Sequence, residues 1–245
     1  MTRLTTCPDA ETVAVRAAAV IERQLQRARD ERGEAHVALS GGTTPGRTYE
    51  LLAATRAEWS AVDVWFADER CVPAEDEQSN YRLAAETLLG PAGVPPARVH
   101  RMEGELGPEQ GAGSYARALT ERAPLDDGAL PVLDVIVLGI GPDGHVASLF
   151  PGAATLDADE RAVCLGVHHS PKPPPERITL SLGVLRAARS CILLATGASK
   201  ADAVSAMLAE PSRSVPASLL RRERLTVIVD DAAAPPPAAR PAPRT

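Results

Sequence analysis

Asp143 and His145 are, by type and position, the residues of this chain best suited to move protons. They follow an apolar run, 132–138, that predicts a buried strand and ends in a glycine-rich turn. Histidine has an unperturbed pKa close to physiological pH, and a neighbouring carboxylate can fix its tautomer or stabilise its charged form. Ligands of open α/β sheets collect beyond the carboxyl ends of strands. Alone, Asp-Gly-His is equally consistent with a turn that holds a solvated aspartate and a capping histidine.

A second candidate site is the loop 40–46, Ser-Gly-Gly-Thr-Thr-Pro-Gly, between a strand at 35–39 and a predicted helix at 47–57. Backbone N–H groups before a helix bind anions, so Ser40, Gly41, Gly42 and Thr43 predict a phosphate site. The loop has neither the Gly-Lys-Ser/Thr of a Walker loop nor the Gly-x-Gly-x-x-Gly of a dinucleotide fold. The alternative interpretation is a tight turn from strand to helix.

Charged residues follow two further predicted strands. Asp68-Glu69-Arg70 closes a strand at 62–67, where Arg70 could pair with a phosphate or a carboxylate and Asp68 could act as a base or orient one. Charge triplets of this kind are also common on protein surfaces. Lys200, one of two lysines among 26 basic residues, lies at a predicted helix start. A cation there opposes the helix dipole unless an anionic ligand is bound.

The composition is typical of a soluble globular protein, with 44% hydrophobic and 24% charged residues among 245. A net charge of −6 without a basic stripe argues against nucleic-acid binding, although a small anion could meet a local cluster of cations. The four cysteines form no Cys-x-x-Cys pair, which favours free thiols and disfavours a zinc site. We find neither a signal peptide nor a membrane-length apolar run, so we expect a cytoplasmic protein without membrane contact.

Helices and apolar strands alternate along the chain, which predicts a mainly parallel sheet sandwiched between helices, a three-layer, Rossmann-like α/β fold. The predicted strands are 35–39, 62–67, 132–138, 162–167, 177–182, 191–195 and 225–229. The predicted helices are 9–29, 47–57, 80–89, 111–122, 199–209 and 216–222. We expect one domain over 1–230 and a disordered Ala/Pro/Arg-rich tail over 231–245.

The loop motifs, in their order along residues 9–230, resemble those of the 6-phosphogluconolactonases, within the larger group that includes glucosamine-6-phosphate isomerase/deaminase. The resemblance is carried by Ser-Gly-Gly-Thr-Thr-Pro at 40–45, Asp-Glu-Arg-Cys-Val-Pro at 68–73, Ser-Asn-Tyr at 79–81, Gly-Pro-Asp-Gly-His-Val-Ala-Ser-Leu-Phe-Pro at 141–151, Pro-Pro-Glu-Arg-Ile-Thr at 174–179 and Gly-Ala-Ser-Lys at 197–200. It implies hydrolysis of 6-phosphoglucono-δ-lactone to 6-phosphogluconate, the second step of the oxidative pentose phosphate pathway. It also implies a small sugar-phosphate lactone as partner, and no metal or organic cofactor.

Two positions separate the branches of this group. The isomerase/deaminase branch has a Glu after Asp-Gly-His that supports ring opening, where this chain has Phe150; it also favours Asp-Glu-Tyr, where this chain has Arg70. The resemblance therefore favours the lactonase, with the isomerase/deaminase as the alternative. A non-catalytic sugar-phosphate-binding protein is a second alternative, although the chain has no spare length or basic helix for a DNA-binding module.

The expected site follows from the loops and the resemblance. His145 takes a proton from the attacking water and returns it to the ring oxygen, while Asp143 orients His145 or holds substrate hydroxyls. The expected catalytic residues are His145, Asp143 and Asp68, and the expected phosphate ligands are Ser40, Gly41, Gly42, Thr43, Arg70, Arg177 and Lys200. The sequence identifies no oxyanion donor. The low aromatic content of 3% predicts a monomer.

Overall fold

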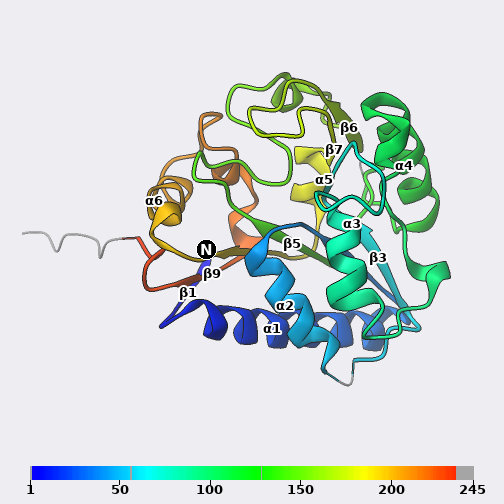
Figure 1. Cartoon of the computed structure of the whole chain (residues 1–245), viewed down its shortest axis with the longest axis horizontal. Helices are drawn as coiled ribbons and strands as arrows, with labels where there is room; N and C mark the ends of the chain where they lie inside the picture. The colour runs from blue at the N-terminus through cyan, green and yellow to red at the C-terminus, as the bar shows by residue number, and fades with distance from the viewer. Residues whose placement is uncertain (1, 56, 128, 236–245) are drawn as a thin grey trace, which may run out of the picture.

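The computed structural model describes residues 2–55, 57–127 and 129–235. Within them, a six-stranded sheet of order β1-β9-β8-β5-β2-β3 forms the centre of the molecule, and every neighbouring pair is parallel (Figure 1). The strands are β1 (Arg3–Cys7), β2 (Ala35–Leu39), β3 (Val62–Phe66), β5 (Val135–Gly139), β8 (Cys191–Ala195) and β9 (Leu225–Asp230). The predicted mainly parallel sheet is confirmed. Edge strand β1 was not predicted, because its half-exposed, partly polar sequence has no apolar run.

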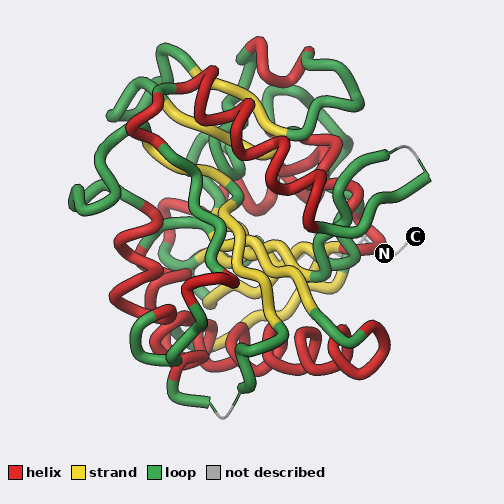
Figure 2. The backbone as a smooth tube through the Cα atoms, turned by 90° about the vertical axis from the view of Figure 1, so that its right-hand side faces the viewer, coloured by secondary structure: helices red, strands yellow, loops and turns green. Residues whose placement is uncertain are grey.

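Helices cover one face of this sheet, and helices together with a second sheet cover the other (Figures 1 and 2). The helices are α1 (Ala10–Arg32), α2 (Thr43–Ala53), α3 (Asn80–Ala84), α4 (Pro108–Arg122), α5 (Leu182–Ala187) and α6 (Ala201–Leu208). A π-helical turn, Ala85–Leu89, continues α3, and 3₁₀ turns lie at Pro96–Arg98, Gly104–Leu106, Ala154–Asp157, Ala198–Lys200, Pro216–Leu219 and Arg222–Arg224. Helices α1 and α2 pack on the first face, while α5 and α6 lie over the other.

The second sheet is antiparallel and has the order β4-β7-β6, with β4 at Asp68–Arg70, β6 at Cys164–Val167 and β7 at Arg177–Leu180. The sequence predicted strands in the last two of these segments but no second sheet. Ala67 explains the difference, because its N–H donates to Leu39 of β2 while its carbonyl accepts from Leu180 of β7. The chain therefore leaves the main sheet at this residue and starts the smaller one. That turn carries Asp68 and Arg70 onto the second face.

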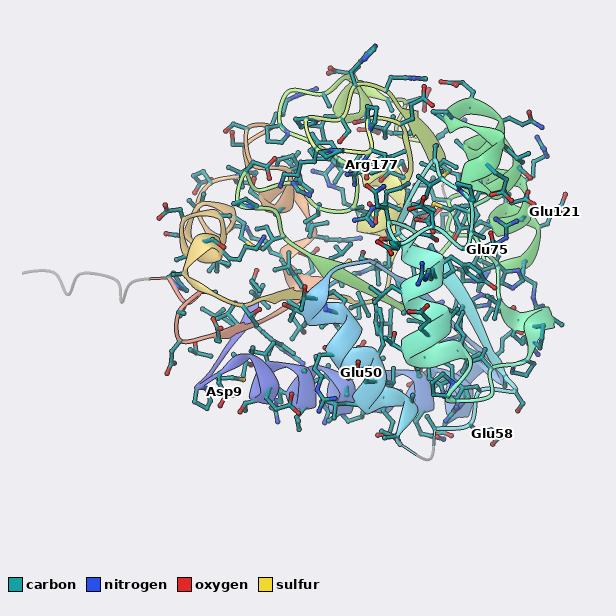
Figure 3. All side chains as sticks on the ribbon, viewed as in Figure 1. Asp9, Glu50, Glu58, Glu75, Glu121 and Arg177 are labelled. Carbon is teal, nitrogen blue, oxygen red and sulfur yellow. The ribbon has the colours of Figure 1, made fainter. Side chains whose placement is uncertain are left out.

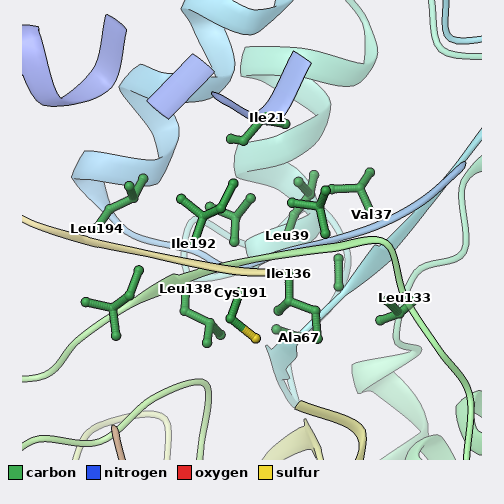
Figure 4. Packing of buried hydrophobic residues seen from close by; sticks show 14 of the residues in the cluster. Ile21, Val37, Leu39, Ala67, Leu133, Ile136, Leu138, Cys191, Ile192 and Leu194 are labelled. Carbon is green, nitrogen blue, oxygen red and sulfur yellow. The ribbon is translucent and has the colours of Figure 1, made fainter. Parts of the chain in front are cut away.

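Alternating aliphatic side chains bury both faces of the main sheet (Figure 4). Ile192 and Leu194 of β8 face Ile21 of α1, while Ile136 and Leu138 of β5 point the opposite way. This two-residue alternation is what a strand buried on both sides requires. Helix α1 starts at its cap, where Asp9 accepts from the N–H of Thr12 at 2.7 Å, and it ends at Gly33 in the left-handed conformation.

The packed domain continues past Asp230. Ala233 is fully buried in the core, and its N–H donates to Asp230 Oδ1 at 2.8 Å. The boundary predicted at residue 230 is therefore a few residues too early. Residues 236–245, the rest of the predicted tail, lie outside the described residues. In the part of the chain that is described, no helix is long and apolar enough to cross a membrane.

A buried ion cluster closes the amino-terminal end of β3. Asp63 is fully buried and bonded by Arg98 Nη1 at 2.6 Å, Arg122 Nη2 at 2.8 Å and His100 Nε2 at 2.7 Å. Burial by itself would raise the pKa of Asp63, but the bonds from His100, Arg122 and Arg98 outweigh it and hold that pKa well below its usual range. The ionised form of Asp63 therefore contributes to the stability of the fold.

Asp63→Asn should lower the free energy of unfolding by about 2–3 kcal/mol at neutral pH. Removing one member of a buried pair costs roughly 3–5 kcal/mol, and the partial exposure of the two arginines reduces that figure. The pKa of Asp63 is lower in the folded protein than in the unfolded chain. The difference in free energy of unfolding between wild type and Asp63→Asn is therefore largest above the unfolded pKa of about 3.9, and it shrinks as pH falls below that value. Urea titrations of both proteins at several pH values measure this gap. The exposed Asp127→Asn is the control, and equal stability of Asp63→Asn and wild type at neutral pH would refute the prediction.

Candidate functional site

The topology brings the predicted loops together at one edge of the main sheet. The chain winds from β2 to β3 on one side and from β5 to β8 on the other, so the strand order reverses between β2 and β5. Ligand sites of open α/β sheets lie at such a reversal, beyond the carboxyl ends of the strands. A cavity of about 460 Å³ opens there, within the roughly 300–1,000 Å³ typical of small-molecule sites. The predicted residues in its wall are Ser40, Gly41, Gly42, Thr43, Asp68, Arg70, His145, Arg177 and Lys200.

Asp143 does not line the cavity; it contacts His145, which does. Asp143 Oδ1 lies 2.5 Å from His145 Nδ1. A carboxylate can only accept, so the imidazole carries its proton on Nδ1 and leaves Nε2 as the basic nitrogen. Burial lowers the pKa of His145 and outweighs the opposing effect of Asp143. This lowered pKa favours the neutral imidazole, the state that a general base needs.

Gly141 makes room for this pair. The Gly141 N–H donates to the His145 carbonyl at 2.9 Å, so the turn folds back on itself. A Cβ atom at Gly141 would lie 2.0 Å from His145 Nδ1 and 2.3 Å from Asp143 Oδ1. Both distances are far below contact, so a side chain at this position would displace the pair. Phe150 covers the other side of the imidazole, with ring centroids 4.5 Å apart.

Asp68 is buried and held by two neighbours that the sequence did not assign to the site. Ser148 Oγ donates to Asp68 Oδ2 at 2.7 Å, and Asn80 Nδ2 donates to the Asp68 carbonyl at 2.8 Å and to its Oδ1 at 3.2 Å. Asn80 also lines the cavity. Asn80 packs directly on Gly41: a Cβ atom added to Gly41 would lie 1.8 Å from Asn80 Oδ1. The Ser-Asn-Tyr motif at 79–81 was the only sequence signal for this contact.

Glu69 positions Asn80 and Arg70 without lining the cavity. Its buried carboxylate accepts from the N–H groups of Arg70, Asn80 and Tyr81 at 2.7–2.8 Å and from Ser79 Oγ at 3.1 Å. Burial raises the pKa of Glu69 despite these bonds. The carboxylate joins the end of β4 to the start of α3, so both loops meet at the cavity. Nothing in the sequence distinguished Glu69 from a surface acid.

The glycine loop ends at a helix N-terminus, as an anion site requires. Gly42 has φ of 113° and precedes α2, which starts at Thr43, four residues earlier than the sequence predicted. Tyr49 of α2 fixes the loop, because its hydroxyl donates to the Ser40 carbonyl at 2.8 Å and accepts from the Ser40 N–H at 3.0 Å. Thr44 bonds to Thr196 at 2.7 Å and so ties this loop to the loop after β8.

The cations of the site differ in how they are held. Arg70 Nη1 donates to the Gln78 carbonyl at 2.5 Å. Arg177, the first residue of β7 (labelled in Figure 3), donates through Nε and Nη2 to the carbonyls of residues 172–174. The Nε and Nη2 groups of Arg177 therefore hold the 172–174 loop. Lys200 lines the cavity, and burial, followed by repulsion from Lys172, lowers its pKa.

Glu34, His36 and Asp63 bring three ligand-type atoms together at the opposite end of the sheet. Arg98, Arg122 and His100 already occupy both oxygens of Asp63. Trp65 Nε1 donates to His36 Nδ1 at 3.2 Å, so neutral His36 carries its proton on Nε2, toward Glu34. Because the group is an ion cluster without a free lone pair on His36, it does not fit a metal ion.

Comparisons with known proteins identify the family of this chain. The model of the glucosamine-6-phosphate isomerases/6-phosphogluconolactonase family matches residues 8–229. A 6-phosphogluconolactonase from Streptomyces coelicolor is 42% identical over 210 residues, covering 82% of this chain and 80% of that protein. One from Rattus norvegicus is 37% identical over 220 residues, covering 86% and 80%. The crystal structure of 6-phosphogluconolactonase from Leishmania guyanensis superposes with a TM-score of 0.84 at 31% identity, covering 95% of this chain and 97% of that one.

The family model spans every loop of the cavity, and the relatives and the solved structure cover 82–95% of the chain. The chain therefore belongs to the glucosamine-6-phosphate isomerase/6-phosphogluconolactonase family.

Proposed function

We propose that this chain hydrolyses 6-phosphoglucono-δ-lactone to 6-phosphogluconate, with His145 as the general base. The observation that carries the proposal is His145, bonded to Asp143, in the wall of a cavity that also contains the N-terminus of α2. One end of the cavity suits a phosphate and another suits proton transfer. The relatives in Streptomyces coelicolor and Rattus norvegicus carry the name of this enzyme.

The proposed reaction begins with water beside His145. Nε2 takes a proton as the water oxygen attacks the lactone carbonyl, and Asp143 holds the imidazolium that forms. The tetrahedral intermediate then collapses, the bond from the carbonyl carbon to the ring oxygen breaks, and His145 returns the proton to that oxygen. Asp68, fixed by Ser148 and Asn80, accepts a hydrogen bond from a substrate hydroxyl.

The 6-phosphate binds at the N-terminus of α2 in this proposal. The backbone of Gly41, Gly42 and Thr43 offers N–H groups, and Ser40 and Thr43 offer hydroxyls. Arg70 and Lys200 add charge from two other loops of the cavity wall. This cluster lets a protein with a net charge of −6 bind an anion. Phe150, packed on His145, provides no acid–base group where the isomerase/deaminase branch has its Glu.

The initial rate of lactone hydrolysis tests this function. The lactone is generated in place from glucose 6-phosphate by its dehydrogenase, and the spontaneous rate is subtracted. We expect a rate well above background, and no ammonia release from glucosamine 6-phosphate. Ammonia release would favour the isomerase/deaminase alternative. A folded protein that binds sugar phosphates without a rate above background would favour the non-catalytic one.

A further inference from the structure

The loop between β6 and β7 brings Lys172 into the cavity, where neither the sequence nor the resemblance assigned it a role. The backbone of Lys172 is fixed on both sides of its Cα atom. Its N–H donates to Ser170 Oγ at 3.2 Å, and its carbonyl accepts from Ser170 Oγ at 2.9 Å and Arg177 Nη2 at 3.2 Å. Arg177 also donates to Pro173 and Pro174 at 3.0 and 3.1 Å. These bonds hold the backbone of Lys172 in a defined place at the edge of the cavity.

The ammonium group of Lys172 lies beside the proton-transfer pair. Its Nζ is 3.6 Å from Asp143 Oδ1, the same oxygen that bonds His145 Nδ1 at 2.5 Å. The short bond belongs to His145, so the ammonium hydrogens of Lys172 remain available to another acceptor. The Lys172 side chain is 39% exposed and has four flexible methylene groups, so Nζ can move toward an anion in the cavity.

The cations of the wall differ in their distance from the proton-transfer pair. Of the described cations that line the cavity, Lys172 alone lies within 4 Å of Asp143. The substrate of the proposed reaction carries its phosphate and its carbonyl at opposite ends, and the carbonyl must reach His145. A negative charge develops on that carbonyl during attack and becomes the carboxylate of the product. A cation beside His145 is placed for this second charge and not for the phosphate.

We propose that Lys172 stabilises the oxyanion that forms on the lactone carbonyl and afterwards contacts the carboxylate of the product. Arg177 acts as a positioning residue, because it holds the loop that carries Lys172. This inference rests on the proposed function. It supplies the oxyanion donor that the sequence did not identify.

Two ligands separate the two ends of the site. 6-Phosphogluconate carries a phosphate and a carboxylate, and glucose 6-phosphate carries the phosphate alone. By titration calorimetry, Lys172→Met should bind 6-phosphogluconate about tenfold more weakly, the effect of one charge-assisted hydrogen bond. It should bind glucose 6-phosphate as wild type does. Lys200→Met, the matched change at the other lysine, should weaken both.

Turnover gives the second measurement. Lys172→Met should lower kcat by about 10²-fold, as removal of one oxyanion donor does, with little change in KM. Lys172→Arg keeps the charge and should retain most of kcat. Equal weakening of both ligands by Lys172→Met would assign Lys172 to the phosphate and overturn the inference. Unchanged kcat of Lys172→Met in an active enzyme would also overturn the inference, but it would leave the proposed function intact. A wild type that binds both ligands without hydrolysing the lactone would overturn both.

Discussion

His145→Asn should lower kcat for lactone hydrolysis by about 10²–10⁴-fold, the contribution of one general acid–base group. Asparagine keeps a donor near the position of Nδ1 and can still bond Asp143, but it has no basic nitrogen in place of Nε2. The phosphate end of the cavity is formed by other loops. Binding of glucose 6-phosphate should therefore change by less than about twofold.

The pH profile separates a catalytic role of His145 from a structural one. Burial holds the pKa of His145 below its ordinary value, and the base must be neutral. We therefore expect kcat/KM of wild type to be constant above that lowered pKa and to fall as pH decreases through it. The residual activity of His145→Asn should lack this fall. His168→Asn is the matched control, because His168 is exposed and its ring nitrogens face Glu109 and Glu176, which do not line the cavity. Wild-type kcat in His145→Asn would remove the residue from the mechanism.

Gly141→Ala should lower kcat by about 10²-fold although the residue contributes no reacting atom. The added Cβ atom would lie 2.0 Å from His145 Nδ1, 2.1 Å from its Cε1 and 2.3 Å from Asp143 Oδ1. The pair must separate to accommodate it, and a displacement of about 1 Å of a catalytic group costs on the order of 10² in rate. Since both side chains are partly exposed, they can shift without unfolding the domain.

Gly113→Ala is the control for Gly141→Ala. Gly113 lies in α4, outside the cavity wall, and a Cβ atom there meets Arg117 Nη1 at an ordinary contact distance of 3.8 Å. The control should retain wild-type kcat and the downfield NMR resonance of the His145 Nδ1 proton. Gly141→Ala should lose both the rate and the resonance, with a melting temperature close to that of wild type. A Gly141→Ala protein that keeps the resonance and the rate would show that the turn has room for a side chain.

The sequence by itself determined the local parts of the site. Apolar runs of five to seven residues can only be buried, so the main strands and the loops that follow them were predictable. The Asp143–His145 spacing and the glycine loop at 40–46 lie within one turn each, and their contacts are local. The alternation of strands and helices also predicted the main sheet, because parallel strands need helical crossovers.

Only the tertiary structure decided which distant segments meet. Asn80, Ser148 and Lys172 reach the site through contacts with Asp68 or Asp143 that are 12, 80 and 29 residues away in the sequence. Short-range patterns carry no information about such pairings. The second sheet depends on Ala67, because its N–H bonds to the main sheet while its carbonyl bonds to the second sheet. No local sequence pattern marks this role. In the sequence, Gly141 is one of several glycines in a turn. Only the position of the His145 side chain shows that a Cβ atom at Gly141 would collide with it. The types of group in the site are thus local properties of the chain, whereas their distances are set by packing of the whole domain.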